Sequence, residues 1–292
     1  MRSAIRLFAV LLILLSMPSV AGAEGILVFA TDYGSGDDSA SQCKAVMLSF
    51  NRNLTIVDMS HNIPQYDVRL TAFLISDSAN LWPEGTVFLA DVDPGSINKG
   101  IVLKTKAGRY YVGPDNGIFS MVANKEGIEK IVGIQNKGYM RATVSPTFMG
   151  RDVFSPVASW LARDDSILDN LGPQLISLYV PDWGHPYIDV KTGVLHGTVL
   201  HVEDPFGNIW TDIGAELFNK LPRKDKSIVM VRVKDKNLLL PVVQKYSDVP
   251  KGQPLAYINS RNVLSIAVNM GDISKILPVT EGDPVEVSIA PF

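Results

Sequence analysis

Carboxylates follow the first apolar segment of the chain at a spacing that suits ligand binding. Asp32 follows the apolar run 26–30 after one threonine, and Asp37 and Asp38 lie in the next turn. A dinucleotide-binding loop is not indicated, because the turn 34–36 lacks a third glycine and two carboxylates at a helix start repel phosphate. These carboxylates suit an ammonium group, a sulfonium or sugar hydroxyls instead. The structural alternative is that Asp37 or Asp38 caps the following helix.

Five further segments place polar side chains among turn residues in apolar surroundings. They are residues 92–95, 113–117, 145–152, 204–208 and 259–261. Sequences such as Asp-Pro-Gly and Pro-Asp-Asn-Gly also form ordinary turns, so none of these segments indicates a site by itself. The aromatic residues Phe148, Phe206 and Trp210 are more often core residues than ligand platforms.

The composition excludes several functional classes. The chain has 292 residues, of which 46% are apolar and 20% charged, and its net charge is −3. This balance is typical of a globular protein and argues against a nucleic-acid partner bound through a basic face. Cys43 is the only cysteine, so the chain forms no internal disulfide. The four histidines, which show no metal-ligand spacing, are His61, His185, His196 and His201. We therefore expect no metal ion and no cofactor.

The first residues have the pattern of a secretory signal peptide. Two arginines precede an apolar run over residues 7–17, and residues 21–23 supply the small side chains that signal peptidase requires. We expect residues 1–23 to be removed. The run is shorter than the ~20 residues that span a bilayer, and an uncleaved anchor is the alternative. The predicted protein is exported, periplasmic or secreted, with no membrane anchor after cleavage.

Alternating strand and helix patterns predict an N-terminal, Rossmann-like α/β domain over residues 24–180. Continuous apolar runs of this kind form the buried strands of a parallel sheet. The predicted strands are 26–30, 55–59, 86–92, 100–104 and 110–112, and the predicted helices are 41–50, 67–81 and 153–162.

Prolines and glycines become frequent over residues 181–193, which we interpret as a linker. Residues 193–292 contain short strand patterns with few helical patterns between them, and they favour a small antiparallel β-barrel or a sandwich. The predicted strands of this second domain are 193–202, 227–233, 237–243, 255–258, 264–268 and 284–289.

In their order along the chain, these segments resemble a known family. It comprises the hydroxide adenosyltransferases that cleave S-adenosylmethionine, and their relatives the fluorinase and the chlorinase. The resemblance runs from Ile26 to about Val287 and is carried by residues 30–34, 37–39, 42–44, 58–61, 93–95, 114–117, 147–152 and 205–208. It implies an α/β domain followed by a β-barrel, and displacement at the ribose C5′ with methionine leaving. It also implies a homotrimer whose ligand lies between one subunit's first domain and its neighbour's second.

The resemblance implies a set of contacts to the ribose and to the methionine part of the substrate. Asp32 matches the aspartate that takes both ribose hydroxyls, and Tyr66 stands where the fluorinase has a ribose-packing tryptophan. Asp37 and Ser39 match residues that hold the methionine amino-acid group. The residues that match its carboxylate clamp are Ser260 and Arg261.

The resemblance also implies which residues surround the adenine and C5′. Phe206 and Asn208 match the adenine-stacking and adenine-hydrogen-bonding positions, and Tyr246 matches a second stacking aromatic. The residues that would line the pocket beside C5′ are Thr147, Phe148 and Gly150.

The hydrolytic members resemble one another in an Asp-Arg-His set that positions and activates water. Asp93 matches the aspartate of this set. The following loop is two residues shorter, so that Asn98 or Lys99 stands where the arginine would fall, and Met149 replaces the histidine. Two of the three groups are altered, which predicts slow attack by water.

Three functions therefore remain open: hydrolysis of S-adenosylmethionine, binding of an adenosine compound with weakened catalysis, and chlorination. Gly150 resembles the chlorinase, since the fluorinase has a serine there. The halogenases, however, carry a tyrosine in place of Asp93. An ionised carboxylate ~4 Å from a halide opposes its binding by about 4 kcal/mol at an effective dielectric constant of ~20. Lys99 would offset part of this repulsion.

Overall fold

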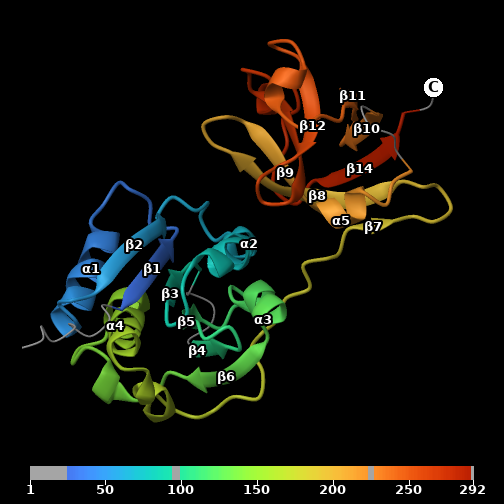
Figure 1. The fold of residues 1–292 in the computed structure, drawn as a ribbon. Coiled ribbons are helices and arrows are strands. Elements are labelled where there is room, and N and C mark those ends of the chain that lie inside the picture. The colour runs from blue at the N-terminus through green and yellow to red at the C-terminus, as the bar shows by residue number, and fades with distance from the viewer. Residues whose placement is uncertain (1–24, 94–98, 223–226, 291–292) are drawn as a thin grey trace, which may run out of the picture.

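The chain folds into two domains, each built on one β-sheet (Figure 1). The structure is a computed structural model, and it describes residues 25–93, 99–222 and 227–290. The predicted signal peptide lies outside the described residues. Over the part of the chain that is described, no helix combines the length and the hydropathy needed to cross a membrane.

The first domain, as far as it is described, contains six strands and four α-helices. The strands are β1 (Ile26–Thr31), β2 (Thr55–Ser60), β3 (Val87–Asp91), β4 (Gly100–Thr105), β5 (Tyr110–Pro114) and β6 (Ile128–Gly133). The α-helices are α1 (Ser39–Phe50), α2 (Val68–Ser78), α3 (Ser120–Glu126) and α4 (Ser155–Arg163). The strand order is β2-β1-β3-β5-β4-β6. This confirms the predicted α/β class.

Parallel pairing fixes which loops meet. β1 pairs in parallel with β2 and β3, and β3 pairs in parallel with β5, whereas β4 and β6 are antiparallel to their neighbours. In the register of β1 and β3, Thr31 lies opposite Asp91. The residues that follow these two strands therefore lie at the same carboxyl edge of the sheet, where open α/β sheets bind ligands.

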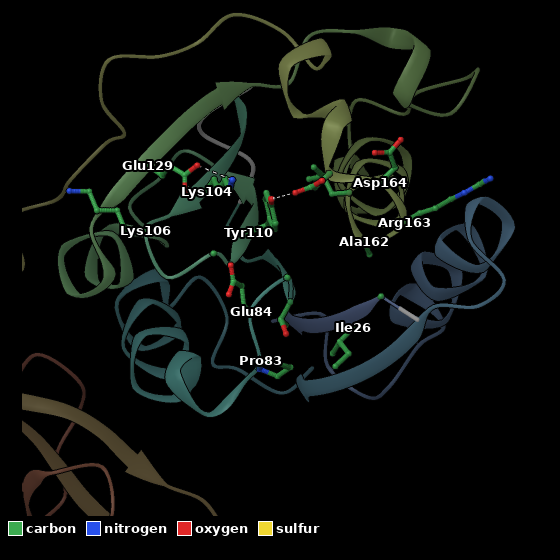
Figure 2. A pocket seen from close by; sticks show the side chains of 16 residues that line it. Ile26, Pro83, Glu84, Lys104, Lys106, Tyr110, Glu129, Ala162, Arg163 and Asp164 are labelled. Carbon is green, nitrogen blue, oxygen red and sulfur yellow. Dashed lines mark hydrogen bonds and ion pairs between the residues drawn. The ribbon is translucent and has the colours of Figure 1, made fainter. Parts of the chain in front are cut away.

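The opposite, amino edge of the sheet borders a cavity of about 670 Å³ (Figure 2). Charges of both signs line it, and some of the polar groups pair with one another. Lys104 Nζ lies 2.8 Å from Glu129 Oε1, and the Tyr110 hydroxyl donates to Asp165 Oδ2 at 2.6 Å. Because these groups satisfy each other and lie at the far ends of the strands from Asp32, we do not place the functional site here.

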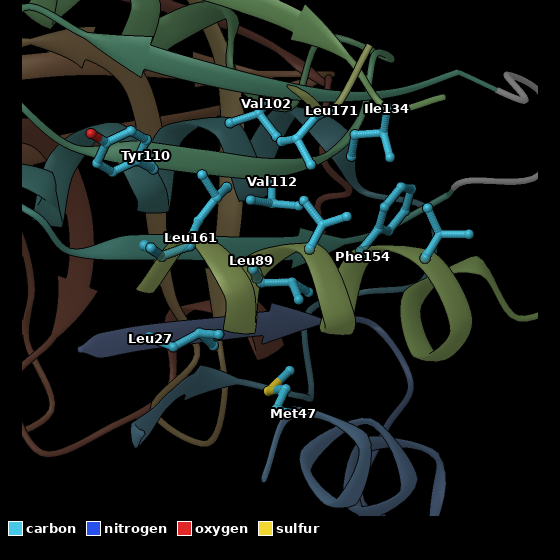
Figure 3. Packing of buried hydrophobic residues seen from close by; sticks show 14 of the residues in the cluster. Leu27, Met47, Leu89, Val102, Tyr110, Val112, Ile134, Phe154, Leu161 and Leu171 are labelled. Carbon is cyan, nitrogen blue, oxygen red and sulfur yellow. The ribbon is translucent and has the colours of Figure 1, made fainter. Parts of the chain in front are cut away.

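Side-chain alternation along the strands builds a core on each face of the first sheet. On one face, Leu27 packs in a cluster with Met47 of α1 and Leu161 of α4 (Figure 3). On the other face, Val28 packs in a cluster with Ile75 of α2. The sheet is thus buried between two helical layers, which explains why its central strands are continuous apolar runs.

The second domain is a nearly closed antiparallel barrel. Its strands are β7 (Tyr187–Ile188), β8 (Leu195–Glu203), β9 (Asn208–Gly214), β10 (Ile228–Val233), β11 (Lys236–Pro241), β12 (Pro254–Ile258), β13 (Val263–Val268) and β14 (Pro284–Ile289), with one short helix, α5 (Ala215–Phe218). The strand order is β11-β10-β14-β8-β9-β13-β12, with β7 beside β8. A bridge between Val242 and Ala256 brings the two ends of the sheet together. The predicted barrel is confirmed.

Short helical turns complete both domains. Their bounds are η1 (Ala79–Leu81), η3 (Lys137–Tyr139), η4 (Gly150–Phe154), η5 (Asp165–Asn170), η6 (Tyr246–Asp248) and η7 (Ile273–Lys275). The turn η4 has π-helical geometry and leads directly into α4.

Helix α2 connects the two domains through ion pairs. Arg69 of α2 donates to Asp212 Oδ2 at 2.7 Å and to the Thr198 hydroxyl at 2.9 Å, both in the barrel. From the barrel, Arg261 donates to Asp77 Oδ2 of α2 at 2.7 Å. The Arg69–Asp212 pair is the less exposed of the two, and both pairs join α2 to the barrel within one chain.

Candidate active site

The loop after β1 carries Asp32, and the structure brings Tyr66 to it. The backbone N–H of Tyr66 donates to Asp32 Oδ2 at 2.9 Å. Tyr66 has a φ of 66°, and 70% of its surface is exposed, so its ring lies free beside a half-buried carboxylate. Such a pair presents acceptor oxygens and an aromatic face to one ligand.

The segment Asp58–His61 holds this loop in place. The Thr31 hydroxyl lies 2.9 Å from His61 Nδ1, and His61 Nε2 lies 3.2 Å from Asp58 Oδ1. The N–H of Gly34 donates to the backbone carbonyl of His61 at 2.6 Å. His61 is therefore a structural residue that fixes the backbone on both sides of Asp32.

The start of α1 presents the Asp37 and Ser39 pair. The backbone N–H of Ser39 donates to Asp37 Oδ1 at 2.8 Å, and this hydrogen bond lowers the pKa of the exposed Asp37 carboxyl. Asp38 occupies the N-cap position without a side-chain cap bond, and it instead accepts from Gln42 Nε2 at 3.0 Å. Asp37 thus stays ionised at the rim of the same loop as Asp32.

The turn after β3 carries Asp93 in a constrained conformation. Asp93 has a φ of 45°, which is rare for a residue other than glycine. The buried Asn116 holds it there, because its amide donates to the backbone carbonyls of Val92 at 2.9 Å and Asp93 at 3.1 Å. Lys99 is exposed at the start of β4. Asn98 lies outside the described residues.

The segment before η4 is anchored by a buried carboxylate. Asp152 accepts from Arg141 at 2.6 Å, from Arg151 at 2.7 Å and from the Ser145 backbone at 2.8 Å, and these bonds hold its pKa well below the usual range. The Arg151 guanidinium also lies over the Phe148 ring, 4.7 Å from its centroid. The anchored residues are Thr147, which is exposed, and Phe148 and Met149, which are half-buried.

A buried group beside Gly150 was missed by sequence reasoning. The hydroxyl of Tyr33 donates to Asp91 Oδ2, and a Cβ at position 150 would overlap both of these atoms. Burial raises the pKa of Asp91 to about 6; hydrogen bonds from Tyr33 and the Gly150 backbone oppose this rise, and the charge of Asp32 adds to it. The available signal was a carboxylate at the end of an otherwise apolar strand, two residues before the Asp93 turn.

The barrel contributes a second, aromatic group of predicted residues. The buried Asn208 donates from Nδ2 to Glu203 Oε2 at 2.7 Å, and its Nδ2 also lies 3.5 Å from the Tyr246 hydroxyl. Tyr246 in turn shares a hydrogen bond of 2.7 Å with Tyr257. Phe206 stands in the preceding loop with 62% of its surface exposed. Two open aromatic faces thus flank a fixed side-chain amide.

The remaining predicted residues lie in the turn between β12 and β13. Ser260 is exposed. Arg261 is half-buried, with its guanidinium 5.1 Å from the centroid of the Trp210 ring and paired with Asp77. A planar guanidinium is also the group that best binds a carboxylate with two hydrogen bonds.

The structure therefore divides the predicted site residues between two groups. The sheet-edge group is Asp32, Asp37, Ser39, Tyr66, Asp93, Lys99, Thr147, Phe148, Met149 and Gly150, and the barrel group is Phe206, Asn208, Tyr246, Ser260 and Arg261. Among the described residues, no hydrogen bond, ion pair or ring contact joins one group to the other. Those same residues contain no cluster of three or more histidine, cysteine or acidic side chains that could hold a metal ion.

Both domains match models of one protein family. The N-terminal domain of the SAM hydroxide adenosyltransferases matches residues 27–172, and the C-terminal domain matches residues 197–286.

Individual relatives extend over nearly the whole chain. A protein named (R)-S-adenosyl-L-methionine hydrolase, from Salinispora tropica, is 32% identical over 263 residues, with 89% of this chain and 96% of that protein covered. A fluorinase from an Actinoplanes species is 29% identical over 299 residues, with 92% of this chain and 99% of the fluorinase covered. The crystal structure of an uncharacterized conserved protein from Thermotoga maritima is similar with a TM-score of 0.84 and 35% identity, covering 90% of this chain and 99% of that one. The chain belongs to the SAM hydroxide adenosyltransferase family.

Proposed function

We propose that this protein cleaves S-adenosylmethionine at C5′ with water as the nucleophile, giving adenosine and methionine. The observation that carries the proposal is the group of carboxylates at the carboxyl edge of the first sheet, in a chain whose two domains both belong to the SAM hydroxide adenosyltransferase family. Relatives named as S-adenosylmethionine hydrolases cover nine-tenths of the chain at about 30% identity, which supports the same reaction.

The reaction is a single displacement. The oxygen of water bonds to C5′ as the C5′–S bond breaks, the bonding electron pair goes to sulfur, and water releases one proton. The sulfonium loses its charge and leaves as the neutral thioether of methionine. Asp93 orients the water by accepting its hydrogen bond, and the turn that Asn116 holds fixes where this carboxylate stands.

The sheet edge binds the charged and sugar parts of the substrate. Asp32 accepts the ribose hydroxyls, since an ionised carboxylate offers about four acceptor positions and the Tyr66 N–H uses one of them. Tyr66 packs against the ribose. Asp37 and Ser39 hold the amino-acid group of the methionine part.

The barrel of a neighbouring subunit binds the adenine and the carboxylate of the methionine part. Phe206 and Tyr246 stack on the base, Asn208 hydrogen-bonds to it, and Ser260 and Arg261 hold the carboxylate. The support for a site that closes only on assembly is that Tyr66 and Phe206, which the family resemblance places on one ligand, are exposed on different domains. We propose a homotrimer with shared sites and no further cofactor.

The first prediction concerns Asp32. Asp32→Asn should weaken adenosine binding at least tenfold, because hydrogen bonds to a charged group contribute ~1.5–3 kcal/mol each. Removing both ribose hydroxyls, with 2′,3′-dideoxyadenosine, should cost the wild-type protein a similar amount. Calorimetry measures both, and Asp38→Asn in the same loop is the matched control. If Asp32→Asn binds adenosine as tightly as the wild type, and the wild type binds 2′,3′-dideoxyadenosine as tightly as adenosine, Asp32 does not bind the ribose.

The second prediction concerns assembly. Light scattering should give the mass of a trimer or a multiple of it. Asp32→Asn and Asn208→Ala subunits can be mixed in equal amounts during refolding. If each site is shared between two subunits, about a quarter of the sites will combine an unaltered first domain with an unaltered second domain, and the mixture should regain about a quarter of wild-type binding. A site contained in one chain would regain nothing, and a monomer that binds adenosine would contradict the shared site.

The third prediction concerns the altered catalytic set. Wild-type protein should form adenosine slowly, because positioning groups contribute ~10²–10⁴-fold and Met149 supplies none. Met149→His combined with Lys99→Arg should raise the rate at least tenfold with little change in affinity, and Asp93→Asn should abolish it. Mass analysis of products, with and without chloride, measures this, and Met270→His is a control at an exposed position.

Other products would identify the alternatives. Unchanged S-adenosylmethionine would indicate a binding protein, and 5′-chloro-5′-deoxyadenosine from the wild type would indicate a chlorinase. Fast hydrolysis by the wild type, slowed by Met149→His, would show that other residues activate the water.

The fourth prediction concerns export. We propose that residues 1–23 direct the protein out of the cytoplasm and are then removed, leaving Glu24 as the first residue. The support is the charged start, the apolar run and the small residues of the leader. Sequencing the amino terminus of protein from the periplasmic or secreted fraction should find Glu24. Retention of Met1, in the cytoplasmic fraction, would contradict export.

A further inference from the structure

A carboxylate occupies the space beside Gly150. Asp91 Oδ2 accepts a hydrogen bond from the hydroxyl of Tyr33, and the backbone of Gly150, which lies against the same carboxylate, lowers its pKa. Only glycine permits this arrangement at position 150, because a Cβ there would overlap both Asp91 Oδ2 and the Tyr33 hydroxyl. The three residues come from β3, the loop after β1, and the start of η4.

The fold does not need a carboxylate at this position. Asp91 is 1% exposed and continues the apolar run of Leu89 and Ala90, where an apolar side chain would avoid the cost of desolvation. Its second oxygen, Oδ1, is buried without a hydrogen-bond partner in the described part of the chain. The negative charge of Asp32 also lies close enough to oppose ionisation of Asp91. Because burying the Asp91 carboxylate destabilises the fold, we look for a functional role of this residue.

The Tyr33 hydroxyl and the Gly150 N–H would form a site for a small anion if the carboxylate were absent. Buried N–H and O–H donors that converge on one point bind an anion well in surroundings of low polarity. The space left by a carboxylate group is about the size of a formate or a halide ion. Asp91 fills that space with an anion that is covalently part of the chain.

We propose that Asp91 is a specificity-determining residue: its carboxylate occupies the position that an anionic nucleophile would take and so restricts the reaction to neutral water. This rests on the proposed function and on the family resemblance, which implies that Gly150 lies beside C5′. Asp91 stands two residues before Asp93, so the sheet edge carries one carboxylate that orients water and repels a halide by its charge, and a second that fills the space a small anion would occupy.

Removing the carboxylate should admit chloride. In Asp91→Ala, chloride would bind to the Tyr33 hydroxyl and the Gly150 N–H. Its attack on C5′ would form a C–Cl bond as the C5′–S bond breaks, and the electron pair would go to sulfur. The products would be 5′-chloro-5′-deoxyadenosine and methionine, and no proton would be released.

The decisive experiment measures anion binding without any chemistry. Chloride or formate should raise the Tm of Asp91→Ala by about 2 °C or more, with saturation, compared with gluconate at equal ionic strength. The wild type should show no such effect, and neither should Asp91→Asn, whose amide still fills the space. Adding Tyr33→Phe to Asp91→Ala removes one donor and should abolish the shift. Asp91→Ser serves as a second variant if Asp91→Ala does not fold.

The second readout is the product from S-adenosylmethionine in chloride. Asp91→Ala should form at least tenfold more 5′-chloro-5′-deoxyadenosine than the wild type. Absence of an anion-specific Tm shift in both Asp91→Ala and Asp91→Ser would overturn the anion site. A shift without chlorinated product, in a protein whose wild type does form adenosine, would overturn the role in specificity. A wild type that forms no adenosine would instead contradict the proposed function, and the Tm measurement would still test the anion site.

Discussion

The in-register parallel pairing of β1 with β3 is the constraint on which the rest of the site depends. It sets Thr31 opposite Asp91 and delivers the loops that follow both strands to one edge of the sheet. The pairing is stable because each strand is apolar on both faces and is buried between helical layers. A slip of one residue would reverse the faces of a strand, so the position of Asp32 relative to Asp93 is fixed by the core.

Polar side chains then hold each loop at this edge. His61 fixes the backbone around Asp32, Asn116 fixes the turn at Asp93, and Asp152 anchors the segment that ends at Gly150. These three residues come from segments that the sequence marks as motifs, and their side chains bond to other parts of the protein. Part of the family pattern therefore preserves the geometry of the site.

The order of apolar runs and helical patterns along the chain, with the turn residues between them, was sufficient to predict the α/β domain and the barrel. Strand β6 was missed because it begins with the exposed pair Ile128-Glu129, and β9 because it follows directly on the turn residues 204–207. Asp32 could be found because it follows a buried strand, and Asp93 because it lies in a turn that resembles the family motif. The carboxylate of Asp91 was visible in the sequence, but its pairing with Tyr33 and Gly150 joins segments that are distant in sequence, and only the folded sheet brings them together.

Attack by water at C5′ places an oxygen from solvent in the adenosine product, so the source of that oxygen tests the reaction directly. With the protein in excess over S-adenosylmethionine, a single turnover in water labelled with oxygen-18 should give adenosine that carries one labelled oxygen, and unlabelled methionine. Unlabelled adenosine from that first turnover would contradict the account, because the oxygen would then have come from a carboxylate of the protein.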